Sequence, residues 1–482
     1  MSQKIKKKLS PNKYLSDKKQ DIINLAEYLF KDGYEEVSVL AVNSTGKRYS
    51  ISKAGMNVAD DSLLCARGFV IRVIKGEKWA EHSCNSINSA DCEAIGAQLR
   101  DNMQSSTNVM ACDRLSVEKD EKDTANFTEY VLHPEEMGDE AILACLEKVR
   151  SKTLACDSKV MDCNVFCSYA GSAKLFVKKT ADKLVQKEQN LLWMTGGISV
   201  MASRGDEIKD YYKGYSNLGG AEVLDDMEND CESIAQSVVA LLDSNQIEPG
   251  EYECICAPDV TGMIVHEAFG HGVEMDMFVK NRALAEEYIG KYVASPLVTM
   301  HDGATAAEQT ATYYFDDEGA DGQDTIIIEK GILKRGISDL RSAYQTKTEP
   351  TGNGRRESYK RKAYTRMTNT FFEAGKDKPE DMIASVKYGF LLENASSGME
   401  DPKNWGIQCM VNIAKEIKDG KLTGKIFSPI VLTGYVPDLL KSITMVSDEV
   451  VLGGGGYCGK GYKEWVKVSD GGPYIKAKIR LG

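Results

Sequence analysis

The chain has 482 residues, of which 42% are hydrophobic, and a formal net charge of -12. This length suggests two to four domains with a sizeable core. The acidic balance argues against nucleic acid as the main partner, because binding phosphates needs clustered lysines and arginines. No run of 18 or more apolar residues occurs, which predicts that the chain does not span a membrane.

The cysteines indicate a reducing environment. Thirteen are scattered without a tight repeated spacing, which argues against a disulfide framework. The basic stretch MSQKIKKKLS is not followed by an apolar segment, so it is not typical of a signal peptide. We therefore expect a cytoplasmic protein whose cysteines are mostly small buried apolar residues.

The first elements alternate between helix and strand. A helix is expected from Ser16, as its N-cap, to a stop at Gly33. Strand patterns follow at residues 35–53, with a turn at 44–46, and at residues 68–83, with a turn at 75–76.

Further along, a charged stretch at residues 113–127 suggests a linker or exposed connection. We expect a helix at 133–151, three or four antiparallel strands at 160–214 and one amphipathic helix at 225–246. The segment IEPGEYECICAP opens a region rich in glycine and strand patterns, which places a boundary near residue 247.

The predicted fold class is α+β. Residues 1–246 would form an N-terminal α/β region of helices and antiparallel strands, divided into two subdomains if the break near 113–127 is real. Residues 247–482 would form a strand-rich C-terminal domain that carries a distorted, zinc-binding helix.

The segment VHEAFGHGVEMD, residues 265–276, contains two of the five histidines of the chain. In the H-E-x-x-H zinc peptidases the histidines lie four residues apart, whereas His266 and His271 lie five apart. On an ideal helix, capped here by Asp259 or Thr261, positions five apart point about 140° apart. The two imidazoles share an ion only if a π-bulge or a break at Gly270 distorts the helix. The alternative is a pair of capping or core histidines.

A catalytic zinc ion needs a third protein ligand and one open position. Candidates are Glu274, Asp276, His301 and the cysteines. Glu274 would share a helix face with His271 if the helix continued. Cys458 lies in GGGGYCGKGY, where glycines allow the backbone to approach an ion closely. The same segment also fits a surface loop with an incidental cysteine.

Three further patterns bear on function. The segment GNGRRESYKRKAYTRMTN, residues 352–369, is either a substrate-facing loop of arginines and tyrosines or a solvated basic loop. The FDDEG segment, residues 315–319, supplies either carboxylates that orient a ligating histidine or a polar strand end. Strand patterns in the second half also suggest that an extended peptide could pair with a sheet edge.

Together these segments resemble the TldD/PmbA family, specifically its TldD-type metallopeptidase subunits. The resemblance rests on four motifs in order and is strong from about residue 250 to the end: HEAFGHGVEMD, FDDEGADGQDTIIIEKGILK, TGNGRRESYKRKAYTRMTNTFFEAGK and YCGKGYKEWVKVSDGGPYIK. It implies that His266, His271 and Cys458 bind one zinc ion and that Glu267 is the catalytic base that activates a zinc-bound water. It also implies hydrolysis of small or unfolded peptides.

The resemblance carries expectations about substrate and partner as well. Arg356, Tyr359 and Arg366 would be substrate-binding residues of the cleft. TldD-type chains pair with PmbA (TldE)-type chains, which lack the metal motif, so a homodimer or such a heterodimer is expected.

This sequence also departs from the family pattern. Tyr462 stands where the family has glutamine, Met275 where it has glycine, and ASSGMEDP at 395–402 differs from the usual segment. These departures bear on substrate preference rather than on metal binding. Two other functions are open: a non-catalytic peptide-binding or assembly subunit whose metal holds the fold, and a small-molecule metal hydrolase such as an amidase.

Overall fold

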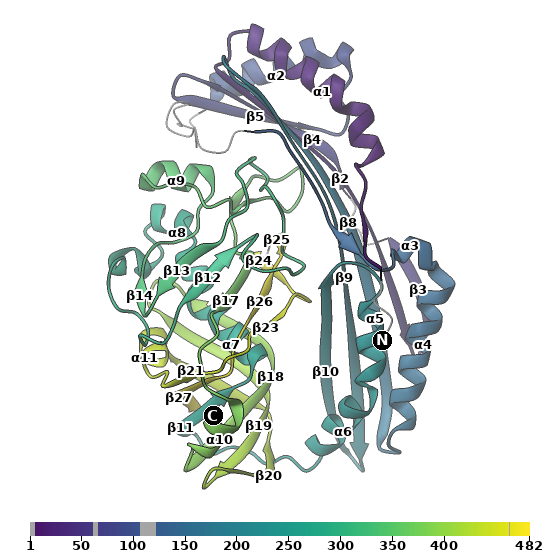
Figure 1. The fold of residues 1–482 in the computed structure, drawn as a ribbon, viewed down its shortest axis with the longest axis vertical. Coiled ribbons are helices and arrows are strands. Elements are labelled where there is room, and N and C mark those ends of the chain that lie inside the picture. Colours follow the sequence, from purple (N-terminus) through teal and green to yellow (C-terminus); the bar gives the residue numbers. More distant parts are fainter. Residues whose placement is uncertain (1–4, 61–65, 107–121, 462) are drawn as a thin grey trace.

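The computed structural model describes residues 5–60, 66–106, 122–461 and 463–482 (Figure 1). Its N-terminal half is built on one eight-stranded sheet with long strands, and its C-terminal half on two further sheets. The predicted α+β class with a strand-rich second half is confirmed.

The N-terminal sheet has the order β10-β9-β8-β2-β4-β5, with β3 pairing with β2 and β6 with β9. Its strands are β2 (Glu36–Ser52), β3 (Gly55–Asp60), β4 (Ala66–Lys75), β5 (Lys78–Cys84), β6 (Thr124–Phe127), β8 (Val160–Lys179), β9 (Leu184–Arg204) and β10 (Glu207–Leu218). The three strands over 160–214 and the turn at 75–76 are confirmed. The predicted turn at 44–46 is wrong, because β2 lies between β4 and β8 and Ser44 pairs with both.

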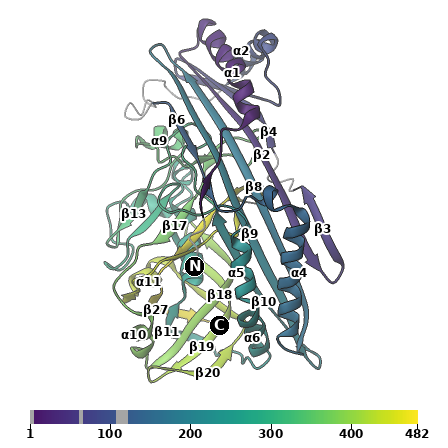
Figure 2. The same cartoon turned by 45° about the vertical axis from the view of Figure 1, so that its right-hand side comes forward.

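Helices cover one face of this sheet, and the C-terminal half covers the other (Figures 1 and 2). Alternate side chains of a strand point to opposite faces. Val37 and Val39 of β2 therefore pack beneath α1 and α2, whereas Leu40 and Val42 face the C-terminal half. The helices are α1 (Lys13–Lys31), α2 (Cys92–Ser105), α3 (Pro134–Met137), α4 (Asp139–Ala155), α5 (Val223–Asn229) and α6 (Cys231–Leu241).

Some helix boundaries differ from the predictions. The N-cap of α1 is Asn12, whose side chain accepts a hydrogen bond from the Leu15 N–H, and Ser16 lies inside the helix. The stop at Gly33 is confirmed, since this residue adopts a φ of 93° after the helix ends. The expected single helix over 225–246 is divided in two at Asp230.

Other corrections concern the segments between the two sets of strands. Helix α2 has no counterpart among the predicted elements. The helix expected at 133–151 is interrupted at Gly138, whose φ is 84°. Residues 124–127 of the expected linker form β6, which pairs with β9, whereas residues 113–121 lie outside the described residues.

The C-terminal half contains a closed sheet. Strand β11 (Gly250–Cys256) pairs with both β18 and β27, which closes the series β11-β18-β19-β21-β27 into a ring. The other strands of this sheet are β18 (Tyr388–Asp401), β19 (Gly406–Lys418), β20 (Lys421–Phe427), β21 (Ile430–Tyr435), β22 (Met445–Val446) and β27 (Ile475–Leu481).

A second sheet lies beside the first, in the order β14-β13-β12-β17-β26-β23. Its strands are β12 (Met300–Gly303), β13 (Thr325–Glu329), β14 (Ile332–Leu333), β17 (Asn369–Phe372), β23 (Val451–Gly453) and β26 (Ser469–Gly472). Helix α7 (Pro258–Val265) packs between the two sheets, against β18 and β26, within the largest hydrophobic core. The first histidine follows α7 directly, so the candidate site lies between the two sheets.

Short elements complete the fold. Two-stranded sheets are formed by β1 (Lys7–Lys8) with β7 (Glu129–Tyr130), by β15 (Gly354–Arg355) with β16 (Tyr364–Thr365), and by β24 (Tyr457–Lys460) with β25 (Lys463–Lys467). Outside the segment of the two histidines, the other helices of the described residues are α8 (Met275–Val279), α9 (Leu340–Thr346), α10 (Pro379–Ala384) and α11 (Val436–Lys441), with 3₁₀ helices at Ser89–Asp91 and Leu284–Tyr288.

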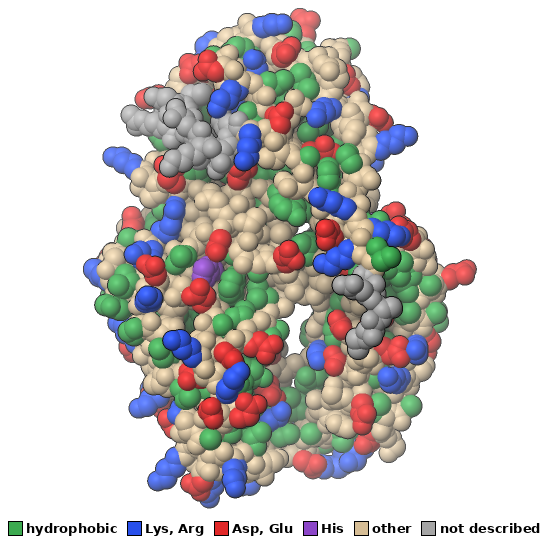
Figure 3. Space-filling view, viewed as in Figure 1, with side chains coloured by type: hydrophobic (Ala, Val, Ile, Leu, Met, Phe, Trp, Pro, Cys, Tyr) green, Lys and Arg blue, Asp and Glu red, His purple; other side chains and the backbone are tan. Residues whose placement is uncertain are grey.

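The two halves are joined through the segment 315–321. Phe315 is fully buried against the residues of β2 and β4 that face away from the helices, and charged pairs surround it. These pairs are Glu318 with Arg72, Asp317 with Lys174 at 2.5 Å, Asp321 with Lys187 at 2.5 Å, and Arg356 with Glu81 at 2.5 Å. Two FDDEG carboxylates, Asp317 and Glu318, therefore join the halves, whereas Asp316 accepts hydrogen bonds from backbone N–H groups of its own half, and none of the three orients a histidine. Figure 3 shows openings between the halves below this contact.

Every cysteine that the structure describes is free, and most of them are buried. No helix within the described ranges is both long enough and apolar enough to cross a bilayer.

Candidate metal centre

The segment that carries both histidines is helical but irregular. Helix α7 ends at Val265, residues His266–Gly270 form one π-helical turn, and His271–Val273 form a 3₁₀ turn. The His271 N–H donates to the His266 carbonyl, an i to i+5 bond that stacks these residues one turn apart. The predicted distortion is therefore confirmed.

The surroundings explain the glycine and correct the predicted caps. A β-carbon at Gly270 would overlap the Met367 thioether, so the close packing of this turn requires glycine. Neither Asp259 nor Thr261 caps the helix: Ala257 is the N-cap, and a proline occupies the first helical position, which its fixed φ favours. Asp259 instead accepts a hydrogen bond from the Ala395 N–H.

Three side chains converge at this distorted turn. The ligand atoms of His266, His271 and Cys458 all lie within 4.8 Å of one another, and the Cys458 Sγ is 3.2 Å from the His271 Nε2. The two imidazole rings are 5.2 Å apart between centroids. Cys458 is buried on β24, so the interpretation as an exposed loop cysteine is wrong.

The other candidate ligands lie outside this cluster. Glu274 approaches the His271 ring from the side, with its Oε2 3.5 Å from the Nδ1, after the helix has ended. Asp276 pairs with Lys460 at 2.6 Å. His301 lies on β12, where its Nδ1 is 2.7 Å from the Asp324 carboxylate.

The electrostatics favour a thiolate in the cluster. Burial opposes ionisation of Cys458, but hydrogen bonds with His266 and His271 outweigh it and lower the pKa of the thiol to about 5. Burial also disfavours the charged form of both imidazoles, yet their contacts with Cys458 raise the pKa of each above its usual value. A thiol with such a pKa is ionised at neutral pH, which is the form that binds a metal.

Each histidine has a carboxylate beside it. The Asp470 Oδ2 on β26 is 3.5 Å from the His266 Nδ1, and Glu274 lies at the same distance from the His271 Nδ1. Carboxylates in these places orient metal-binding imidazoles. Sequence reasoning did not identify Asp470, because no local pattern in VSDGG connects it with a histidine 204 residues earlier in the chain.

Glu267 lies in the same π turn and is partly exposed. Its carboxylate makes no hydrogen bond or ion pair with any residue that the structure describes, so its proton-binding atoms are available. The aliphatic part of the Glu267 side chain packs against Gly398 of β18, where an added β-carbon would lie 3.0 Å from the Glu267 Cδ. The position of Glu267 therefore depends on a glycine in the neighbouring strand.

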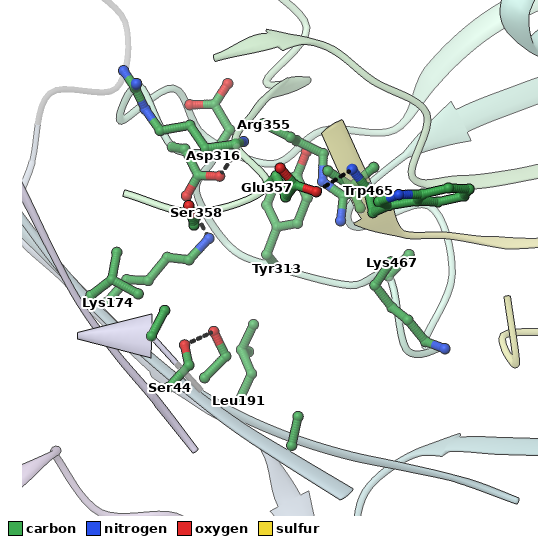
Figure 4. Close-up of a pocket in the computed structure, with 18 of the residues that line it drawn as sticks. Ser44, Lys174, Leu191, Tyr313, Asp316, Arg355, Glu357, Ser358, Trp465 and Lys467 are labelled. Atoms are coloured by element: carbon green, nitrogen blue, oxygen red, sulfur yellow. Dashed lines mark hydrogen bonds and ion pairs between the residues drawn. The ribbon is translucent and has the colours of Figure 1, made fainter. Parts of the chain in front are cut away.

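The predicted substrate residues lie in two different places. Arg356 and Tyr359 line a cavity of about 150 Å³ between the halves, together with Lys174, Arg355 and Trp465 (Figure 4). Arg356 also pairs with Glu81 of the N-terminal sheet. Arg366 is only 1% exposed, so it has no surface for a substrate contact. A substrate role for Arg356 and Tyr359 stays a prediction.

Comparison with known proteins agrees with the motifs. Residues 249–480 match the family model described as the PmbA/TldA metallopeptidase C-terminal domain. The C-terminal half of the chain therefore matches a domain of the PmbA/TldD family. The predicted resemblance is thereby confirmed.

Relatives of this chain include a metalloprotease TldD homolog of Buchnera aphidicola subsp. Schizaphis graminum, 37% identical over 246 residues, which are 50% of each chain. A zinc metalloprotease TldD homolog of Saccharolobus solfataricus is 28% identical over 59% of this chain and 64% of its own. The chain thus spans about half the length of the Buchnera relative that it matches.

Two solved structures share the fold over nearly the whole chain. One is a candidate modulator of a DNA gyrase from Thermotoga maritima MSB8, with a TM-score of 0.76 and 15% identity over 96% of this chain and 100% of its own. The other is TldE from Thermococcus kodakarensis, with a TM-score of 0.71 and 17% identity over 95% of this chain and 100% of its own. At these identities the likeness establishes the fold of both halves.

Proposed function

We propose that this protein is a zinc-dependent metallopeptidase that hydrolyses peptide bonds in small or unfolded peptides. The observation that carries the proposal is the cluster of His266, His271 and Cys458 with Glu267 in the same turn. The names of the relatives, metalloprotease and zinc metalloprotease, support it.

The residues present fit zinc. Two imidazoles and a thiolate are donors that favour zinc among the common ions. Three protein ligands leave a fourth coordination position, as catalytic sites do. Zinc, when bound, supplies a Lewis acid that polarises a peptide carbonyl and makes a water molecule more acidic.

The chain's own residues would handle the protons and the orientation. Glu267 would take a proton from the attacking water and pass it to the leaving amine, acting first as a general base and then as a general acid. Asp470 and Glu274 would keep the two imidazoles in the orientation that binds the metal. His266, His271 and Cys458 would hold one zinc ion per chain.

A sheet edge beside the site supports an extended peptide as substrate. Beyond Leu392, β18 loses its pairing with β11, and within the described structure its residues 395–401 pair with β19 alone. Gly398, which touches Glu267, lies on this edge. A peptide that adds as a strand here is held through main-chain hydrogen bonds, which require little of its sequence.

The partner and the location are part of the proposal. TldE is the name of a protein that shares this fold, which supports a heterodimer with a PmbA (TldE)-type chain, with a homodimer as the alternative. The site lies in the half that carries the family match. We place the protein in the cytoplasm on its free, mostly buried cysteines.

The decisive experiment replaces Glu267 with glutamine in the zinc-loaded protein. A peptide library of mixed sequence, analysed by mass spectrometry, reports cleavage of whichever sequences the protein accepts. We expect the wild type to cut peptides, and Glu267→Gln to retain zinc but lose on the order of a hundredfold or more in rate. Glu286→Gln, at an exposed position, is the matched control and should behave as the wild type.

Two outcomes would contradict the proposal. Unchanged cleavage by Glu267→Gln would remove its role as the base. A wild type that binds zinc, loses stability on chelation and cuts no peptide, alone or with a TldE-type partner, would favour the non-catalytic subunit. Free amides tested beside the peptides distinguish a small-molecule amidase.

A further inference from the structure

The hairpin that carries Cys458 is not part of a larger sheet in the structure as described. Strands β24 and β25 pair only with each other in the described part of the chain. Residues 453–456, just before the hairpin, are four glycines, and added β-carbons at Gly455 and Gly456 would contact nothing within 4 Å. The hairpin is continuous with the six-stranded sheet at its two ends, through β23 and β26, and Gly455 and Gly456 separate Cys458 from the first of these strands.

One buried side chain links both strands of this hairpin to the rest of the domain. The Arg366 guanidinium donates from Nη2 to the Cys458 carbonyl at 2.8 Å and from Nη1 to the Glu464 carbonyl. Cys458 belongs to β24 and Glu464 to β25. A planar guanidinium presents its donors in a fixed fork, so the two bonds define both the orientation of the hairpin and its distance from Arg366.

Arg366 is itself rigidly placed. Its backbone N–H donates to the Asn353 carbonyl at 3.0 Å, and the Asn353 side chain donates to the Arg366 carbonyl at 3.0 Å. Asn353 is fully buried and Arg366 is 1% exposed. The guanidinium therefore extends from a fixed point in the domain core to the hairpin.

A buried carboxylate connects this arginine with the second histidine. The Glu274 Oε1 lies 3.4 Å from the Arg366 Nε, and its Oε2 lies 3.5 Å from the His271 Nδ1 and 3.2 Å from the Lys460 Nζ. Lys460 is the last residue of β24. Glu274 is 1% exposed, so these attractions act with little solvent screening.

We propose that Arg366, with Glu274 as its counterion, is a positioning residue of the metal centre. It fixes the backbone of Cys458 relative to the His271 ring so that the thiolate meets both imidazoles. In this role Arg366 binds neither the metal nor the substrate. It thus differs from the three proposed metal ligands and from Glu267, the proposed base. The inference rests on the proposed zinc site.

Cobalt binding provides the test, because a thiolate ligand to Co²⁺ gives a charge-transfer band that a loss of stability alone does not change. The full-length protein is stripped of metal and titrated with Co²⁺ alone. Arg366→Met removes the fork, and Arg366→Lys keeps a charge opposite Glu274 but cannot donate to two carbonyls in the same geometry. Arg361→Met, in the same segment and half exposed, is the matched control.

We expect both Arg366 variants to bind cobalt about ten- to a hundredfold more weakly than the wild type, with a weakened or shifted thiolate band at saturation. Arg361→Met should match the wild type in both readouts. If Arg366→Met does not fold, as judged by circular dichroism, Arg366→Lys decides alone. Wild-type affinity and an unchanged band in the folded variants would overturn the inference and leave the zinc site intact. A wild type without the band would refute the zinc site itself.

Discussion

Replacing Gly398 with alanine tests whether Glu267 acts from the position that the structure gives it. An added β-carbon would lie 3.0 Å from the Glu267 Cδ, closer still to its Cγ, and 2.7 Å from the Met263 Sδ. Carbon atoms in contact settle at about 3.5–4.0 Å, so the Glu267 side chain must move by roughly 1 Å. A misplacement of about 1 Å in a reacting group lowers the rate by about a hundredfold.

We therefore expect Gly398→Ala to reduce kcat/KM by about a hundredfold in a peptide-cleavage assay, with zinc content unchanged because no metal ligand is displaced. Gly406→Ala, in the strand that pairs with β18, is the control, since its added β-carbon would meet nothing within 4 Å. Wild-type activity in Gly398→Ala, with zinc bound, would show that Glu267 does not need this position and would refute the reasoning.

Three further changes have defined expectations. Glu81→Gln leaves Arg356 without its carboxylate and should lower the free energy of unfolding by about 3 kcal/mol in urea titrations, whereas the exposed Glu77→Gln should change it little. Burial opposes ionisation of Glu81, but Arg356 and Arg72 lower the pKa of this carboxyl to about 2. The stability that the ionised Glu81 contributes is therefore present above about pH 4.5 and is lost as the pH falls towards 2. A stability difference between the wild type and Glu81→Gln that does not shrink below pH 4 would contradict this. Chelation of zinc should lower the thermal midpoint of the wild type but not of Cys458→Ser, because the metal ties the hairpin to the π turn; an equal response in both would exclude that link. Gly270→Ala should lower the free energy of unfolding by about 2 kcal/mol, because the added methyl group overlaps the Met367 thioether, and adding Met367→Ala to this variant should restore part of the loss. An unchanged free energy of unfolding in Gly270→Ala would show that the turn accommodates the methyl group and would contradict this expectation.

The residues proposed to hold the metal are those that the sequence indicates, whereas the residues that surround and orient them could not be found from the sequence. The scarcity of histidine and the glycine at position 270 indicate both the site and the helix distortion within twelve residues of sequence. Cys458 could be selected among thirteen cysteines only by resemblance, because its spacing from His271 follows from the tertiary fold. Asp470, Arg366 and the counterion role of Glu274 depend on packing between distant segments, which no local pattern records.

In the fold, too, features set by local sequence could be predicted, whereas features set by distant segments could not. Alternating strands and amphipathic helices were predictable where local pattern and burial agree, as along β8 and β9. The turn expected at 44–46 fails because β8 pairs with β2 without a break through its Ser-Thr-Gly residues, while β4 pairs with the first of them. The FDDEG pattern fits a polar strand end equally well, and only the cations of the opposite half show that Asp317 and Glu318 join the two halves. The departure at Tyr462 lies outside the described residues.

The most direct measurement is the zinc content of the purified protein, by elemental analysis, in the wild type and in Cys458→Ser side by side. It does not depend on the right peptide or on a partner chain. The account predicts about one zinc ion per chain in the wild type and much less in the variant. Equal zinc in both, or none in either after purification without chelators, would contradict the centre of His266, His271 and Cys458.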